Sequence, residues 1–115
     1  MTSFNLFRNE LSDRITLEYG ELMEAGLSPE SIVQVFLDRY EDELDDDLKH
    51  AVFWINLAKV QLLLEFSREQ PVLHSQVRDS AIEAIRGLKE KNDPAYLVQK
   101  HDLDEILDDL LSRRG

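Results

Sequence analysis

The chain of 115 residues contains no cysteine and has only four glycines and three prolines. Without cysteine there is no disulfide framework, no thiolate zinc site and no cysteine nucleophile, which is typical of proteins in a reducing, cytoplasmic compartment. The scarcity of glycine and proline, with 43% hydrophobic and 32% charged residues, excludes collagen-like and disordered chains. This size and composition predict a single globular domain over residues 1–115.

Basic residues are also few: there are 13, against 24 acidic residues, so the net charge is −11 at pH 7. Such a charge repels nucleic-acid phosphates and anionic membranes and attracts basic proteins. Residues 51–55 form the longest apolar run, far short of the roughly 20 residues that cross a bilayer. Residues 1–8 lack the basic and apolar stretches of an export signal. We therefore expect a cytoplasmic protein with a basic protein partner and neither a nucleic-acid nor a membrane partner.

Apolar residues recur at helical spacing along the chain, and no alternating strand pattern is present. Gly26 predicts the end of one helix, and Ser28 before Pro29 predicts the start of the next. The segment 48–66 is apolar nearly all round, so we expect it at the centre of a compact, antiparallel, all-α bundle of five or six helices. The expected helices cover about 4–25, 29–40, 48–66, 72–86, 94–99 and 102–113.

Residues 41–47 place six carboxylates in seven positions, and their mutual repulsion predicts a solvated turn whose last aspartates can cap the next helix. Charge is uneven along the chain, since residues 1–47 hold 13 of the 24 acidic residues and three of the 13 basic ones. A field concentrated in this way steers a cationic partner, although an acidic run can also be plain solvated surface. The predicted partner-binding residues of this run are Glu41, Asp42, Glu43, Asp45, Asp46 and Asp47.

A second acidic patch is expected on the outer side of the first helix. At 100° per residue, Glu21 and Glu24 fall in one narrow arc. Leu17 and Leu6 fall in the same arc, and apolar residues inside a charged rim are typical of the core of an interface. We therefore add Glu21, Glu24 and Leu17 to the predicted partner-binding residues.

The sequence predicts no catalytic residue, cofactor or metal ion. An EF-hand loop starting at Asp42 would need glycine at its sixth position and glutamate at its twelfth, where Asp47 and Phe53 stand. No glycine-rich phosphate loop and no nucleophile elbow is present. A small metal hydrolase stays open as an alternative, with four candidate ligands: His50, His74, His101 and Asp102.

Residues 51–61 open with a Phe-Trp pair and continue as an apolar stretch that ends in glutamine, and residues 76–85 carry a Val-x-x-x-Ala-Ile pattern. Together they resemble a helix pair of small bacterial proteins, several of which are associated with toxin immunity. The resemblance spans about a third of the chain. It implies an intracellular protein that binds and blocks a toxin domain without catalysis of its own, and it transfers no functional residue because the matching positions are core positions.

We therefore expect an acidic, non-enzymatic binding module, most concretely an immunity or antitoxin-like inhibitor that occludes a basic partner such as a nuclease toxin. Its carboxylates would occupy the Lys- and Arg-lined groove in which such an enzyme holds phosphates. The alternative is a structural or regulatory subunit whose last helix completes a homodimer or larger assembly. The apolar side of that helix consists of Leu103, Ile106, Leu107, Leu110 and Leu111.

Overall fold

Helices account for most of residues 6–44, 46–68 and 73–113, which the computed structural model describes. Within these ranges there is no strand, so the predicted all-α fold is confirmed. None of the described helices combines the length and the apolarity that crossing a bilayer requires. The six α-helices are α1 (Glu10–Glu24), α2 (Pro29–Tyr40), α3 (Asp47–Arg68), α4 (Ser75–Glu90), α5 (Pro94–Val98) and α6 (Lys100–Ser112), and a 3-10 turn, Glu41–Glu43, follows α2.

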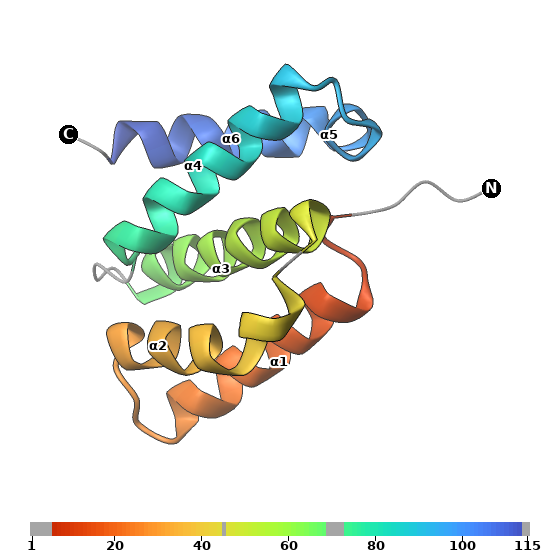
Figure 1. Cartoon of the computed structure of the whole chain (residues 1–115). Coiled ribbons are helices and arrows are strands. Elements are labelled where there is room, and N and C mark those ends of the chain that lie inside the picture. Colours follow the sequence, from red (N-terminus) through yellow and green to blue (C-terminus); the bar gives the residue numbers. More distant parts are fainter. Residues whose placement is uncertain (1–5, 45, 69–72, 114–115) are drawn as a thin grey trace.

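Helix α3 lies at the centre of the molecule, as Figure 1 shows. Helix α1 packs on α3 and α2 packs on α1, while α4 packs on α3 from the opposite side. Helices α5 and α6 pack on α4. Helix α2 runs antiparallel to α1, and α4 runs antiparallel to both α3 and α6 (Figure 1). The predicted antiparallel bundle around a central helix is therefore confirmed.

The burial of α3 follows from its sequence. All eight residues from 51 to 58 are buried, because a helix that is apolar nearly all round must be covered by several neighbours. Phe36 of α2 contacts both α1 and α3: its ring centroid lies 6.1 Å from that of Tyr19 on α1 and 6.4 Å from that of Phe53 on α3. This aromatic cluster joins α1, α2 and α3 into one core.

Two buried amides of α3 tie neighbouring segments to that core. Asn56 donates from Nδ2 to the carbonyl oxygens of Leu6 and Val52, at 2.9 and 2.8 Å. Gln61 donates from Nε2 to the Tyr19 hydroxyl at 3.1 Å, and its Oε1 accepts from the His74 amide at 3.0 Å. Both side chains are therefore satisfied within the fold, as buried polar groups must be.

The first helix begins at Glu10, not near residue 4 as predicted. Asn9 stops the helix because its Oδ1 accepts from the Ser12 amide while Ser12 Oγ accepts from the Asn9 amide, both at 2.9 Å. This capping box satisfies amides that have no partner at a helix start. Leu6 consequently precedes the helix and is fully buried, so its predicted place on the outer arc was wrong.

The fourth helix was also placed wrongly at its end. It continues through Gly87 to Glu90 and closes at Asn92, which adopts a left-handed φ of 50°. The Asp93 amide donates to the Leu88 carbonyl at 3.0 Å, which completes the closing motif without glycine. The predicted start near residue 72 was also wrong: residue 72 itself lies outside the described residues, but residues 73 and 74 are not helical and α4 begins at Ser75, after its cap His74. The predicted end at Gly26 is confirmed by its φ of 92°, and the remaining boundaries agree to within two residues.

Candidate functional site

The outer side of α1 exposes a large apolar residue among carboxylates. Leu11, Ile15 and Tyr19 turn the inner side of this helix to the core, whereas the side chain of Leu17 on the opposite side is 64% exposed. Four carboxylates share the outer side, and all four residues are exposed. We call this surface the Leu17 face; its members are Glu10, Asp13, Leu17, Glu21 and Glu24.

The spacing of the Leu17 face follows the helix. Asp13 and Glu21 stand four residues before and after Leu17, so each lies one turn away on the same side. Glu10 and Glu24 extend the stripe to both ends of α1, over about 20 Å at 1.5 Å per residue. The face thus has an apolar centre and an acidic rim, which is the arrangement of a protein-binding surface.

The acidic run of residues 41–47 is divided between a 3-10 turn and a helix cap. Glu41 and Asp42 are exposed on the turn. Asp46 uses its Oδ1 to accept from the amides of Leu48 and Lys49, at 2.8 and 3.2 Å, so the expected capping of α3 is confirmed. Asp47 is the exposed first residue of α3. Asp45 and the side chain of Glu43 lie outside the described residues.

The acidic run adjoins one end of the Leu17 face. A cleft of about 420 Å³ is lined by Glu10 and Arg14 from α1 and by Asp46 and Lys49 from the start of α3, among others. Glu21 and Glu24 lie at the other end of α1. The structure therefore brings Asp46 of the acidic run to the Glu10 end of the face, where Arg14 and Lys49 also line the cleft.

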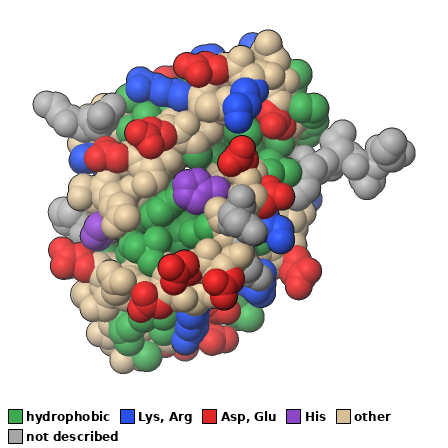
Figure 2. All heavy atoms as spheres, in the orientation of Figure 1, with side chains coloured by type: hydrophobic (Ala, Val, Ile, Leu, Met, Phe, Trp, Pro, Cys, Tyr) green, Lys and Arg blue, Asp and Glu red, His purple; other side chains and the backbone are tan. Residues whose placement is uncertain are grey.

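Acidic side chains are not confined to α1. Figure 2 shows several of them on one face of the molecule, above and below a strip of apolar side chains.

On the flank of α1, Arg39 of α2 forms an ion pair with Glu18 at 3.4 Å. That pair neutralises the side of α1 that turns to α2, so the excess negative charge of the helix stays on the Leu17 face.

The candidate metal ligands have local roles instead. His50 Nε2 accepts from the Trp54 indole at 3.0 Å, and His74 Nδ1 accepts from the Gln76 amide at 3.1 Å and so caps α4. His101 Nε2 lies 3.4 Å from Glu105 Oε1, and the two side chains form an ion pair only when the imidazole is protonated. In the part of the chain that the structure describes, no three His, Cys, Asp or Glu side chains form a group that could hold a metal ion.

Two buried tyrosines have perturbed acidity. Tyr96 donates its hydroxyl to Asp104 Oδ1 at 2.7 Å, and this hydrogen bond, with burial and the carboxylate charge, raises the pKa of Tyr96. Burial raises the pKa of Tyr19, and the hydrogen bond from Gln61 offsets part of that effect. Both phenols stay protonated at neutral pH, and each takes part in one of these hydrogen bonds within the fold.

The apolar side of α6 faces the interior of this chain. Leu103, Leu107 and Leu110 are buried, and Ile106 and Leu111 are half-buried against the same core. The leucines that suggested a homodimer thus pack within one molecule.

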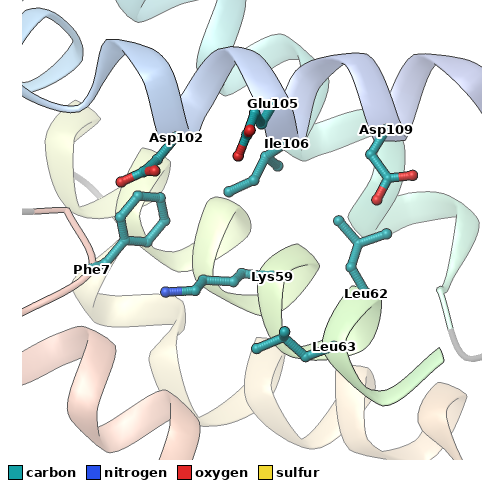
Figure 3. Close-up of a pocket in the computed structure, with 8 residues that line it drawn as sticks. All are labelled: Phe7, Lys59, Leu62, Leu63, Asp102, Glu105, Ile106 and Asp109. Atoms are coloured by element: carbon teal, nitrogen blue, oxygen red, sulfur yellow. The ribbon is translucent and has the colours of Figure 1, made fainter. Parts of the chain in front are cut away.

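Between α6 and α3 the structure opens a groove of about 420 Å³ that sequence reasoning missed. Leu63 of α3 is 59% exposed in its lining. No pattern in the sequence distinguishes Leu63 from the half-buried leucines beside it, because its exposure depends on where α6 packs. The lining of this α3–α6 groove, drawn in Figure 3, is Phe7, Lys59, Leu62, Leu63, Asp102, Glu105, Ile106 and Asp109.

Comparison with models of protein families, with curated proteins and with solved structures finds no match to this chain.

Proposed function

We propose that this protein is an acidic, non-enzymatic binding module that holds a basic protein partner on the Leu17 face. The observation that carries the proposal is the 64% exposure of Leu17 at the centre of a stripe of exposed carboxylates. A leucine in this position loses its contact with water when a partner covers it, and the rim carboxylates pair with the partner's cations at the edge.

The two components of the face act on different rate constants. Long-range attraction between the acidic face and a basic partner accelerates association, and this effect weakens as salt is added. Burial of Leu17 slows dissociation, because most of the affinity in an interface comes from a few desolvated anchors. Charge therefore selects the class of partner, and the leucine holds it.

In its sharper form the proposal is an immunity or antitoxin-like inhibitor of a nuclease toxin in the cytoplasm. A nuclease binds phosphates in a groove lined by Lys and Arg, so a row of carboxylates can occupy that groove in place of the nucleic acid. The Leu17 face supplies four such carboxylates along α1. Glu41, Asp42 and Asp47 are exposed on the neighbouring acidic run and extend the row.

The test is capture of partners at low salt from the cell that makes the protein, with variants of the face and matched controls. The face variants are Leu17→Ser and the double substitution Glu21→Gln with Glu24→Gln. The control for the leucine is Leu97→Ser, since Leu97 on α5 is 54% exposed. The control for the carboxylates is the double substitution Glu83→Gln with Glu90→Gln, two exposed acids of α4.

We expect the natural protein and both controls to retain the same basic protein, and both face variants to lose it. With that protein purified, Leu17→Ser should raise the dissociation rate, and the double glutamine variant should lower the association rate mainly at low salt. Equal retention by face variants and controls would reject the Leu17 face as the binding surface. Inhibition of the captured protein's nuclease activity would separate the inhibitor from an adaptor.

A further inference from the structure

The α3–α6 groove lies between two helices that both pack against α4. Helix α4 packs against both α3 and α6, and α6 lies on α4 and α5. The side chains of Lys59, Leu62 and Leu63 therefore reach from α3 toward a space that α6 does not fill (Figure 3). Phe7, just before α1, closes one end of this space.

The two walls of the groove have different chemistry. The α3 wall and the end at Phe7 are mainly apolar, with Leu63 59% exposed, and Ile106 of α6 continues this surface. The α6 wall carries three carboxylates, Asp102, Glu105 and Asp109, which Figure 3 shows pointing from α6 toward the groove. An occupant must therefore offer an apolar surface to α3 and positive charge to α6.

We propose that the α3–α6 groove binds a basic amphipathic helix of a partner protein. The three carboxylates stand at positions i, i+3 and i+7 of α6, so they form one row about two turns long. A helix lying alongside would present lysines or arginines at the same spacing to this row. Its adjoining apolar stripe would cover Leu62 and Leu63, as in other complexes where an amphipathic helix fills a hydrophobic groove.

Existing ion pairs show which carboxylates meet the partner. Asp109 Oδ1 pairs with the Nε of Arg113, just after the end of α6, at 3.1 Å, and Arg113 also pairs with Glu65 of α3. Lys59, the one base of the lining described, is drawn to the Phe7 end of the groove, with its Nζ 4.4 Å from the centre of the Phe7 ring. Glu105 lies 3.4 Å from His101, which pairs with it only when the imidazole is protonated. The partner's cations are therefore expected at Asp102 and, with a neutral His101, at Glu105; both carboxylate residues are exposed.

This binding surface goes beyond the Leu17 face. Leu17 is not among the described residues that line the groove. Substitutions can therefore remove one surface and leave the other, so the two proposals can fail separately.

The test uses the full-length protein and a synthetic helical peptide as the probe, with lysines along one side and leucines on the adjoining side. A second peptide of the same composition with scrambled order controls for attraction by net charge alone. Binding is followed by fluorescence anisotropy of the labelled peptide at low and at high salt. The groove variants are Leu63→Ser and the double substitution Asp102→Asn with Glu105→Gln; the controls are Leu97→Ser, the double substitution Glu83→Gln with Glu90→Gln, and Leu17→Ser.

We expect the amphipathic peptide to bind the natural protein more tightly than the scrambled peptide. Leu63→Ser should weaken binding roughly tenfold at both salts, because an exposed apolar anchor is lost. The double rim variant should weaken it roughly three- to tenfold at low salt and less at high salt, as expected of two exposed ion pairs. All control variants should bind within about twofold of the natural protein.

Three results would overturn the proposal. Equal loss of binding in groove and control variants would mean that the peptide senses only net charge. Loss in Leu17→Ser alone would place the peptide on the Leu17 face. A dimer in sedimentation that Leu63→Ser dissociates would mean that a second copy of this chain occupies the groove. Thermal unfolding of each variant shows whether a loss reflects the groove or the fold, and Leu63 is exposed enough for the serine to be tolerated.

Discussion

Gln61 is a buried polar group of α3 with hydrogen bonds to two other segments, and its replacement by leucine gives a sharp test of the fold. The side chain is fully buried. It joins α1, through the Tyr19 hydroxyl, to the start of α4, through the His74 amide, with bonds of 3.1 and 3.0 Å. Gln61→Leu keeps a similar volume and removes both bonds.

The expected loss of stability is the cost of two orphaned groups. The Tyr19 hydroxyl is buried and the His74 amide is partly buried, so neither is rehydrated freely. Each unsatisfied group of this kind costs about 1–3 kcal/mol, and the added apolar surface of leucine offsets part of it. We expect Gln61→Leu to lower the free energy of unfolding by about 2–4 kcal/mol.

The measurement is urea unfolding followed by circular dichroism for four proteins: the natural chain, Gln61→Leu, Tyr19→Phe and the double variant. Tyr19→Phe removes the orphaned hydroxyl, so the double variant should be more stable than Gln61→Leu alone by about 1 kcal/mol. The two losses are thus expected to be strongly non-additive. Additive losses, or a Gln61→Leu variant as stable as the natural chain, would refute this account of the buried amide.

Three further predictions concern other parts of the fold. Gly26→Ala should lower the free energy of unfolding by about 1 kcal/mol, because φ is 92° while nothing lies within 4 Å of the added Cβ; an unchanged urea midpoint would contradict this. Asn92→Gly should raise the free energy of unfolding by about 0.5 kcal/mol, since φ of Asn92 is 50° and glycine avoids the steric cost at this position; a lower urea midpoint would contradict this prediction. The pKa of Tyr96 is raised above 10.0 in the folded protein, so its hydrogen bond contributes fully below pH 10.0 and the contribution is lost as pH rises through the folded value. Tyr96→Phe should therefore flatten the alkaline fall in unfolding free energy, and superimposable pH profiles of the two proteins would reject the assignment.

The helices that the sequence predicts well are those whose ends are marked by a specific residue type. Ser28 before Pro29 and the glycine at position 26 mark their boundaries correctly, because each has a local mechanism that does not depend on the rest of the fold. The central position of α3 was equally predictable, since a helix without a polar side has to be buried.

The errors arose where a helix cap or a tertiary contact outweighs the local apolar periodicity. Phe7 and Leu6 continue the apolar spacing of α1, but Asn9 caps the helix after them and Asn56 holds the Leu6 carbonyl from 50 residues away. Gly87 looked like a helix end, yet α4 continues because Asn92 closes it one turn later. The two caps are local and compete with the apolar spacing, whereas the contact of Asn56 with Leu6 joins distant parts of the sequence.

The candidate surfaces divide in the same way. Leu17, Glu21 and Glu24 were predicted from periodicity alone, and the structure places all three on the exposed side of α1. Asp46 was predicted to bind a partner, and the structure shows it also caps α3. The α3–α6 groove could not be predicted, because its two walls are far apart in the sequence, with α4 and α5 between them along the chain.

The central claim, that the Leu17 face holds a basic protein, is tested most directly by photo-crosslinking in the cell that makes the protein. A photoreactive phenylalanine analogue is placed at position 17, and in a control at the exposed position 83 of α4. The account predicts a covalent adduct with one basic protein from position 17, absent from position 83 and reduced by the double substitution Glu21→Gln with Glu24→Gln. No adduct at position 17, or the same adducts from both positions, would contradict it.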